Sequence, residues 1–302
     1  MTDWTPVAIV AVALVGALGT AVIEQALLLG VVRPRLLLRD GLATLRQPLS
    51  RPEQRDATLF HGAPVLLVLS AVVALAFVPW TPDFRGIDLT TGAIAVPAAL
   101  AYVTPAVFMA GWGAGRPLAV VGGFRWIALM LAYAMPIAMV VTAVAAPAGS
   151  LRPSDIVEVQ HAVPMALVQP LALALWLPAA LAVCFLPPFD LPQAGSELGG
   201  GAFAEYRGLD AALVWLAQRI LLVAMAAMTV VLFGAGWHGP LLPPAVWMVA
   251  KTAAVVALAL WVGRRVPRVE IDRLLPLAWK VANPLALVAI VHAGLVTLIF
   301  YR

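Results

Sequence analysis

Long apolar stretches separated by short charged segments dominate the pattern of hydrophobic and polar positions along the chain. A membrane-spanning helix needs about 20 consecutive apolar residues, and eight stretches have roughly this length. They cover residues 7–31, 63–80, 92–114, 124–147, 161–187, 211–236, 244–263 and 279–301. The pattern predicts an all-α integral membrane protein, a single polytopic domain over residues 1–302 with a bundle of about eight transmembrane helices.

The composition supports this class. Of the 302 residues, 63% are apolar and 11% are charged, and the mean hydropathy is +0.98. A water-soluble domain of this composition would expose large apolar patches, and a disordered chain would need low hydrophobicity. After eight spans no room is left for a large soluble domain, so we expect such a domain to come from partner chains.

Cysteine and histidine provide little for a metal centre. Cys184 is the one cysteine, which excludes a disulfide framework, an iron–sulfur cluster and a thiolate zinc site within this chain. His161, His238 and His292 fall toward one side of the membrane, where two could ligate a haem iron, but no two share a helix at ligand spacing. We therefore expect no metal ligand.

Basic residues fall mainly on one side of the predicted bundle. Fifteen of the nineteen lie at helix ends on one side: Arg33, Arg35, Arg39, Arg46, Arg51, Arg55, Arg116, Arg125, Arg207, Arg219, Arg264, Arg265, Arg268, Arg273 and Lys280. Cytoplasmic connections are enriched in arginine and lysine, which also accounts for the net charge of +4 without nucleic acid. We expect both termini to be non-cytoplasmic and the loops 32–62, 187–210 and 264–278 to be cytoplasmic.

Two ionisable residues lie within predicted spans, where charge is costly and often functional. For Lys251 two interpretations stay open: a proton relay, or a side chain that reaches the outer interface. Glu24, near the end of its span, favours an interfacial salt bridge.

Loop 187–210 concentrates acidic residues on the arginine-rich side. Asp190, Glu197, Glu205 and Asp210 lie within 21 residues of one another. Insertion into a membrane does not require these charges. The loop is either simply solvated or a surface for a ligand or a cytoplasmic partner.

The segment PPFDLPQAGSELGGGAFAEYRGLD closely resembles the signature loop of the H subunit of bacterial NADH-quinone oxidoreductase, respiratory complex I. Two further stretches are similar to motifs of that family: GWGAGRPLAVVGGFRWIALMLAYA at 111–134, and the segment from Pro267 to Leu285. The family's lysine in the seventh helix falls on Lys251. The resemblance covers residues 85–300 well and residues 1–84 in outline.

The resemblance implies a membrane subunit at the junction with the hydrophilic arm, where partner subunits supply the electrons and quinone is the substrate. It implies no catalytic centre or cofactor in this chain alone, other membrane-arm and hydrophilic-arm subunits as partners, and the bacterial inner membrane as location. Residues that would line the quinone chamber or the arm interface are Arg125, Asp190, Glu197, Glu205, Tyr206, Arg268, Asp272 and Lys280. A proton path would use Glu24, Glu205 and Lys251.

The chain also departs from this family. Ala134, Val183, Leu186 and Gln218 stand where members carry charged residues of the proton path. A relay needs titratable groups or bridging water, so we expect weakened proton coupling. Two alternatives stay open: the membrane anchor subunit of a formate hydrogenlyase or membrane hydrogenase, which is related to this family, and a non-pumping scaffold.

Overall fold

The computed structural model describes residues 5–50 and 52–300, and the regular structure in these ranges is helical. Arg51 and Arg302, two of the nineteen basic residues, lie outside the described residues. The longer helices are α1 (Thr5–Leu29), α3 (Ala57–Ala76), α4 (Gly92–Ala101), α5 (Val103–Gly113), α6 (Pro117–Ala145), α9 (Pro170–Val183), α11 (Gly208–Phe233), α12 (Pro244–Arg265) and α14 (Asn283–Phe300). Shorter elements are α2 (Pro34–Leu45), α7 (Pro153–Val159), α8 (Met165–Val168), α10 (Gly195–Leu198) and α13 (Ile271–Leu277). Two 3₁₀ turns at Ala146–Ala148 and Gly201–Phe203 and a π-helical segment at Ala278–Ala282 complete the described elements.

Seven helical segments of the described chain are long and apolar enough to cross a membrane. They are α1, α3, α4 with α5, α6 with the turn that follows it, α11, α12, and α13 with α14. This confirms the predicted all-α, multi-pass membrane fold.

The predicted span 161–187 is wrong as a continuous helix. It is divided into α8 and α9, and α9 has 14 residues, which at 1.5 Å per residue is about 21 Å and short for a hydrocarbon core. The break lies at Gln169, whose backbone angles are φ −129° and ψ 61°. Pro170 explains it, because proline lacks an N–H and disfavours helical geometry at the residue before it.

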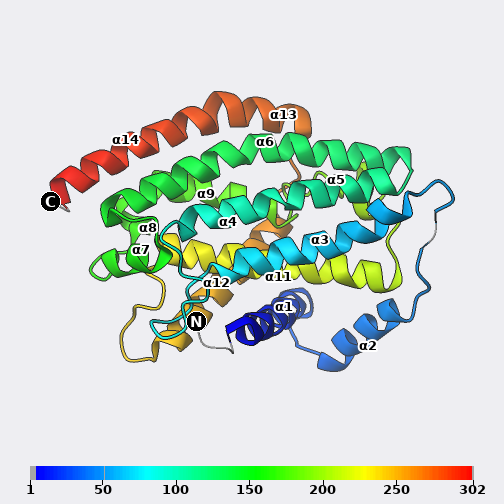
Figure 1. The fold of residues 1–302 in the computed structure, drawn as a ribbon, viewed down its shortest axis with the longest axis horizontal. Helices are drawn as coiled ribbons and strands as arrows, with labels where there is room; N and C mark the ends of the chain where they lie inside the picture. The colour runs from blue at the N-terminus through cyan, green and yellow to red at the C-terminus, as the bar shows by residue number, and fades with distance from the viewer. Residues whose placement is uncertain (1–4, 51, 301–302) are drawn as a thin grey trace.

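Helix α11 is the centre of the bundle. Within its spanning window 83% of the residues are buried, compared with 22% for α1 and for α12. In Figure 1 the axes of the long helices α3, α5, α6 and α11 are nearly parallel, with α5 running opposite to the other three. The apolar run from Ile220 to Phe233 is therefore enclosed by other helices on nearly all sides.

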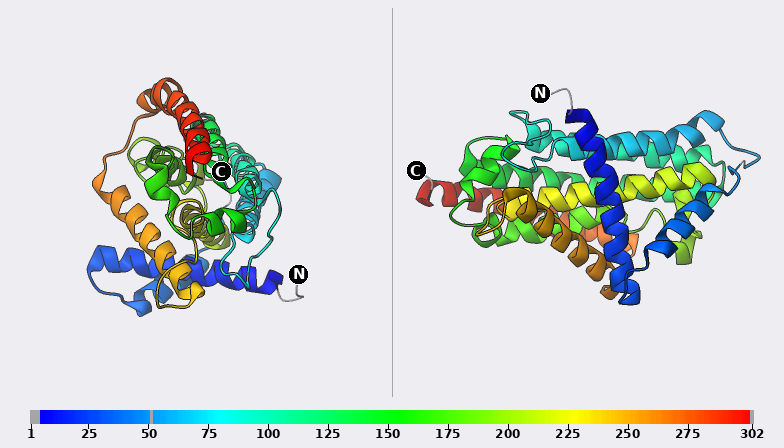
Figure 2. Two further views of the ribbon diagram at one scale, coloured as in Figure 1. Left: turned by 90° about the vertical axis from the view of Figure 1, so that its left-hand side faces the viewer. Right: turned by 90° about the horizontal axis from the view of Figure 1, so that it is seen from below.

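Helix α1 has a different orientation from its neighbours. Figure 2 shows α1 running across the bundle, and α12 is also oblique. In a simple up-and-down bundle α1 would lie alongside the other helices. The close approach at Gly16 permits this crossing, because an added Cβ there would lie 3.1 Å from the side chain of Val223 on α11. Most of the surface of α1 stays exposed and apolar.

The bundle has two polar ends. At the first, called the charged end, α3, α6 and α11 begin and the segment 184–207 folds over them (Figure 1). At the opposite end the same three helices finish. The segments 77–91, 146–169 and 234–243 lead from them to α4, α9 and α12.

The three loops predicted as cytoplasmic contain more regular structure than expected. Loop 32–62 includes all of α2 and the first residues of α3, and loop 264–278 includes α13. Loop 187–210 includes α10, a 3₁₀ turn and the start of α11.

Candidate functional site

Loop 187–210 packs tightly against α6 through glycines. A Cβ added to Gly122 on α6 would lie 2.5 Å from the backbone nitrogen of Ala202 and 2.7 Å from the carbonyl oxygen of Pro192. Gly201 has φ +55°, a left-handed conformation that favours glycine, and its own approach to Pro192 leaves no room for a side chain. The Ala202 N–H donates to the Pro192 carbonyl over 3.0 Å, which closes the loop on itself. The loop therefore has a defined shape in which its acidic residues are held in place.

Two of the predicted site residues form an ion pair between α6 and the loop. Arg125 Nη1 donates to Glu197 Oε2 over 2.5 Å, with half of the Glu197 side chain exposed. Arg116, just before α6, lies 3.8 Å from Glu205, and both of these side chains are partly exposed. Exposed pairs of this kind contribute little to folding free energy, so their charges are available to a partner.

A more buried ion pair joins the loop to the segment after α12. Arg268 Nη2 lies 2.8 Å from Asp190 Oδ2, and the Asp190 side chain is only 9% exposed. The Val269 N–H donates to the Pro188 carbonyl at 3.0 Å, so the two segments are joined through backbone as well. Burial raises the pKa of Asp190 above its ordinary value, and the positive charge of Arg268 opposes that shift.

Tyr206 fastens the loop to α3. Its hydroxyl donates to the Phe60 carbonyl over 2.8 Å, and its ring stacks on the Phe60 ring with 4.3 Å between centroids. Burial raises the pKa of Tyr206, and the nearby Asp210 carboxylate adds to the shift. Tyr206 therefore acts as a fixed neutral donor.

One polar pair at this end was not singled out from the sequence. His61 Nδ1 on α3 lies 2.7 Å from Asp210 Oδ2 at the start of α11, where Asp210 is buried. The sequence carried only a weak signal, an acidic residue in the first turn of α11 and a histidine near the start of α3. The two residues are 149 positions apart in the chain, and this spacing does not indicate that they are in contact.

Asp272 and Lys280 lie apart from these pairs. Both are exposed, Asp272 in the first turn of α13 and Lys280 in the π-helical segment. The structure thus connects loop 187–210 to Arg125, Arg116, Arg268 and Phe60, and leaves the last two predicted site residues on the surface.

Two apolar cavities meet at Phe189, next to the Asp190–Arg268 pair. One, of about 370 Å³, lies between α9, α11 and α12; the other, of about 270 Å³, lies between α6, α9 and the α13–α14 segment. Phe189 lines both cavities. A hydrophobic chain could occupy either cavity with a polar group near Asp190.

The candidate proton-path residues outside the loop are each fixed by partners. Glu24 on α1 forms an ion pair with Arg219 on α11, which agrees with the predicted interfacial salt bridge. Lys251 Nζ donates to the carbonyls of Gly234, Gly236 and His238 at 2.7, 3.0 and 2.7 Å, so it reaches the connection between α11 and α12 at the opposite end. No residue between Ile220 and Phe233 of α11 is ionisable.

Among the four neutral positions, Val183 is fully buried at the end of α9, while Ala134, Leu186 and Gln218 are half-buried. Within residues 5–50 and 52–300 no group of three or more histidine, cysteine, aspartate or glutamate side chains could hold a metal ion. Fold and site together define a multi-pass helical membrane protein with a structured, charged loop face at one end.

Comparison with known proteins places the chain within this class. The family model described as NADH dehydrogenase matches residues 30–294, and the chain belongs to this family. The H subunit of NADH-quinone oxidoreductase from Geobacillus kaustophilus is 37% identical over 266 residues, which is 87% of this chain and 80% of the relative. The H 2 subunit of the same enzyme from Syntrophobacter fumaroxidans is 34% identical, covering 80% of this chain and 76% of the relative.

A solved structure has the same fold. A chain of the membrane-bound sulfane sulfur reductase, an archaeal respiratory membrane complex, aligns with a TM-score of 0.83 over 96% of this chain and 98% of that chain. Sequence identity is 22%, so the likeness concerns the fold alone. The relatives and this neighbour belong to larger membrane complexes, and the chain likewise works together with partner chains.

Proposed function

We propose that this chain is the membrane subunit of a complex I-type NADH-quinone oxidoreductase that forms part of the quinone-binding chamber and the junction to the hydrophilic arm. The observation that carries the proposal is the shaped loop 187–210, which is held to three other segments by Arg125–Glu197, Arg268–Asp190 and Tyr206–Phe60. The relatives, each named as the H subunit of NADH-quinone oxidoreductase, supply the reaction.

The residues divide into two roles in this proposal. The partly exposed charges Arg125, Glu197 and Glu205, with the surface residues Asp272 and Lys280, face the hydrophilic arm. Asp190, Arg268 and Tyr206 shape the chamber beside the apolar cavities at Phe189, where an isoprenoid tail fits the lining. Redox chemistry belongs to partner subunits, and this chain positions the quinone.

A photoreactive quinone tests the proposal. Native membranes containing the assembled complex would be labelled with an azidoquinone, and labelled peptides identified by mass spectrometry. Labels on loop 187–210 or on the helices that line the cavities at Phe189 are the expected result, reduced by excess unlabelled quinone. Competable labels confined to partner subunits would contradict a chamber role for this chain.

We also propose that proton coupling through this chain is weakened. Glu24, Glu205 and Lys251 are the remaining ionisable candidates for a path, and the centre of α11 between Arg219 and the opposite end provides no carrier. A relay through uncharged residues would depend on water held by groups such as Gln218.

The proposed topology places the charged end in the cytoplasm and both termini outside it, in a bacterial inner membrane. The distribution of basic residues supports it, because arginines near helix ends mark the cytoplasmic side. Alkaline phosphatase fused after Arg302 should be active, and a reporter that works only in the cytoplasm should be inactive there. The reverse result would overturn the topology.

A scaffold role is the second candidate. It is favoured because the chain retains loop 187–210 but has neutral residues where the family carries buried charges. Purification of the native complex separates the candidates. NADH-oxidising partners with quinone reductase activity support the first proposal, nickel-containing partners indicate a hydrogenase anchor, and an assembly without redox subunits indicates a scaffold.

A further inference from the structure

Helix α2 is the one helix of 12 or more described residues that buries none of its own side chains. It is nevertheless fixed in place. The Gln25 side chain on α1 accepts from the Arg33 N–H at 2.7 Å and donates to the Arg33 carbonyl at 3.2 Å, just before α2 begins at Pro34. After α2, the Gln47 carbonyl lies so close to Gly208 that an added Cβ would be 2.6 Å away. Both ends of α2 are therefore joined to membrane-spanning helices.

The exposed side of α2 carries two adjacent stripes. Leu38, Leu42 and Leu45 follow the i, i+4, i+7 pattern of one helix face and are 65%, 52% and 51% exposed. Arg35 and Arg39 precede Leu38 and Leu42 by three residues each, so every pair is within contact distance on the helix surface. The side of α2 that contacts α11 carries the half-buried Leu36 and Leu37 instead.

The arginines of this surface have no counterion within the described part of the chain. Among the residues that the structure describes, no hydrogen bond or ion pair involves the guanidinium groups of Arg35, Arg39 or Arg46. Four acidic residues at this end, Glu24, Glu197, Glu205 and Asp210, each lie beside another basic side chain. Asp40 follows Arg39 directly and so points about 100° away around the helix.

We propose that the outer surface of α2, formed by Arg35, Arg39, Arg46, Leu38, Leu42 and Leu45, is a binding site for anionic phospholipid. The leucines contact acyl chains near the headgroup level, and the arginines donate hydrogen bonds to the phosphodiester of a lipid whose headgroup carries no positive charge. This combination of an apolar stripe and basic side chains on a short helix suits a membrane interface better than an acidic protein surface, which would leave the leucines unmatched. The site is independent of the quinone proposal.

The test uses the full chain reconstituted in phosphatidylcholine vesicles that contain traces of spin-labelled phosphatidylglycerol or spin-labelled phosphatidylcholine. The fraction of motionally restricted label measures association at the protein surface. Wild-type protein should prefer phosphatidylglycerol, and R35Q/R39Q should reduce that preference by about fivefold or more, given the attraction of each basic residue to anionic lipid. R35K/R39K keeps the charge and should keep the preference.

R273Q/K280Q is the matched control, because it removes two exposed basic residues from the same end of the molecule, on the segment that packs against α6. An equal loss in this control would overturn the proposal, and so would a wild-type protein without preference. If R35Q/R39Q does not fold, rising salt applied to the wild type replaces it, and the preference should then fall.

Two further measurements exclude other ligands. Inorganic phosphate should compete no better than chloride at equal ionic strength, and selective competition by phosphate would show a plain anion site and overturn the proposal. The assembled complex should retain the preference, whereas its loss there would show that an acidic partner protein covers α2.

Discussion

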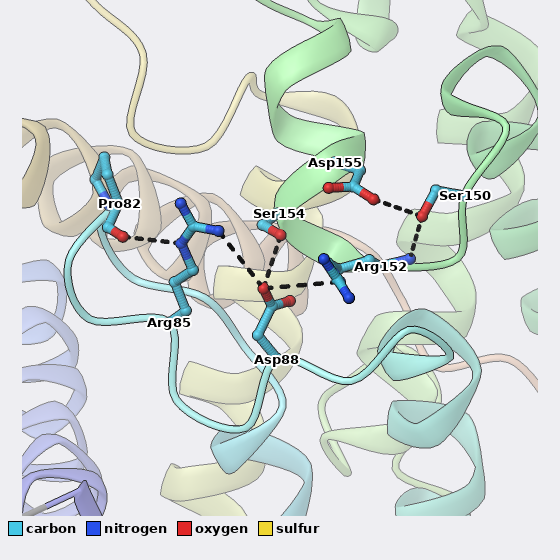
Figure 3. A network of polar contacts seen from close by, with 7 residues as sticks. All are labelled: Pro82, Arg85, Asp88, Ser150, Arg152, Ser154 and Asp155. Atoms are coloured by element: carbon cyan, nitrogen blue, oxygen red, sulfur yellow. Dashed lines mark hydrogen bonds and ion pairs between the residues drawn. The ribbon is translucent and has the colours of Figure 1, made fainter. Parts of the chain in front are cut away.

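Charged pairs at the two polar ends of the bundle join different kinds of segment. At the charged end, ion pairs such as Arg125–Glu197 and Arg268–Asp190 connect loop 187–210 to other segments and leave one side chain about half exposed. At the opposite end, Asp88 accepts a hydrogen bond from Ser154 at 2.9 Å and lies beside Arg85 and Arg152, in the network of Figure 3.

A buried amide at the opposite end binds backbone groups. Gln160 donates to the carbonyls of Ile156 and Val231 and accepts from the N–H groups of Met165 and Ala235, which uses its full hydrogen-bonding capacity. The polar groups at this end hold the connecting segments to one another and to α11. The exposure of paired charges does not distinguish the two ends, since the Arg85 side chain is 46% exposed and the Glu197 side chain 50%. The ends differ in what the pairs join: loop 187–210 at the charged end, and the connecting segments at the opposite end.

Charge reversal at the charged end should give the largest effect. Glu197→Lys with Glu205→Lys replaces acids beside Arg125 and Arg116 by like charges, and a charged pair lost across a partly desolvated interface costs about 2–5 kcal/mol. We expect normal membrane insertion with loss of the hydrophilic arm during purification. The matched double variant at the opposite end, D83K/E158K, should keep the arm; recovery of the complete complex from both variants would show that the loop is only solvated.

A methyl group at the contact between loop and α6 should come next. Gly122→Ala places a Cβ against backbone atoms of Ala202 and Pro192, which cannot move as a flexible side chain can, at a cost of about 1–3 kcal/mol. Faster proteolysis within loop 187–210 and a lower melting temperature are the expected measurements. Gly195→Ala in the same loop meets nothing within 4 Å and should match the wild type.

Restored acids should increase proton uptake. In sealed vesicles, the wild-type complex should take up fewer protons per electron pair than a complex whose corresponding chain carries all the family acids. Ala134→Glu with Gln218→Glu should raise that ratio without changing assembly, because both half-buried positions would regain a titratable group. A full ratio in the wild type would mean that other groups or water bridge the gap.

Removal of one charge from the network of Figure 3 should affect stability alone. Asp88→Asn weakens the interaction with Arg85 and Arg152, and we expect a loss of about 1–2 kcal/mol, seen in thermal unfolding, with the hydrophilic arm still bound. Asp83→Asn, exposed in the same loop, is the control and should change little. Arm loss caused by Asp88→Asn would contradict the separation of roles between the ends.

The smallest effect should come from pH at His238. Burial lowers the pKa of His238, and His161 and Lys251 add to this, while Glu158 opposes it. The unfolded chain then binds a proton more readily than the folded one, so stability should fall as pH drops below about 6.5. His238→Gln should make the melting temperature depend less on pH over this range. A pH profile identical to that of the wild type would contradict the role of His238.

The sequence predicted the fold well where hydropathy alone decides it. Seven long spans follow from apolar run length, but the same measure could not show that Gln169 breaks the fifth run, since Pro170 adds no polarity. Hydropathy also could not predict the crossing of α1, because it does not show how a helix is oriented relative to its neighbours. The crossing depends on contacts such as that of Gly16 with Val223.

The candidate site was predictable where a motif carries it. The loop residues Asp190, Glu197 and Glu205 came from the sequence, as did Arg125 and Arg268, but which of these residues pair emerged only in three dimensions. The His61–Asp210 pair lay beyond prediction, because its members belong to helices distant in the chain and follow no periodicity.

The contacts of Lys251 have a consequence for proton movement that follows from counting hydrogens. An ammonium group has three hydrogens, and three carbonyl oxygens surround Nζ, so each hydrogen has one acceptor. A neutral amine has two, and a departing proton would orphan one carbonyl at a cost of about 1–3 kcal/mol. The three carbonyls thus favour the ammonium form, which ties α12 to the end of α11, and a proton that passed through Lys251 would have to break one of these contacts.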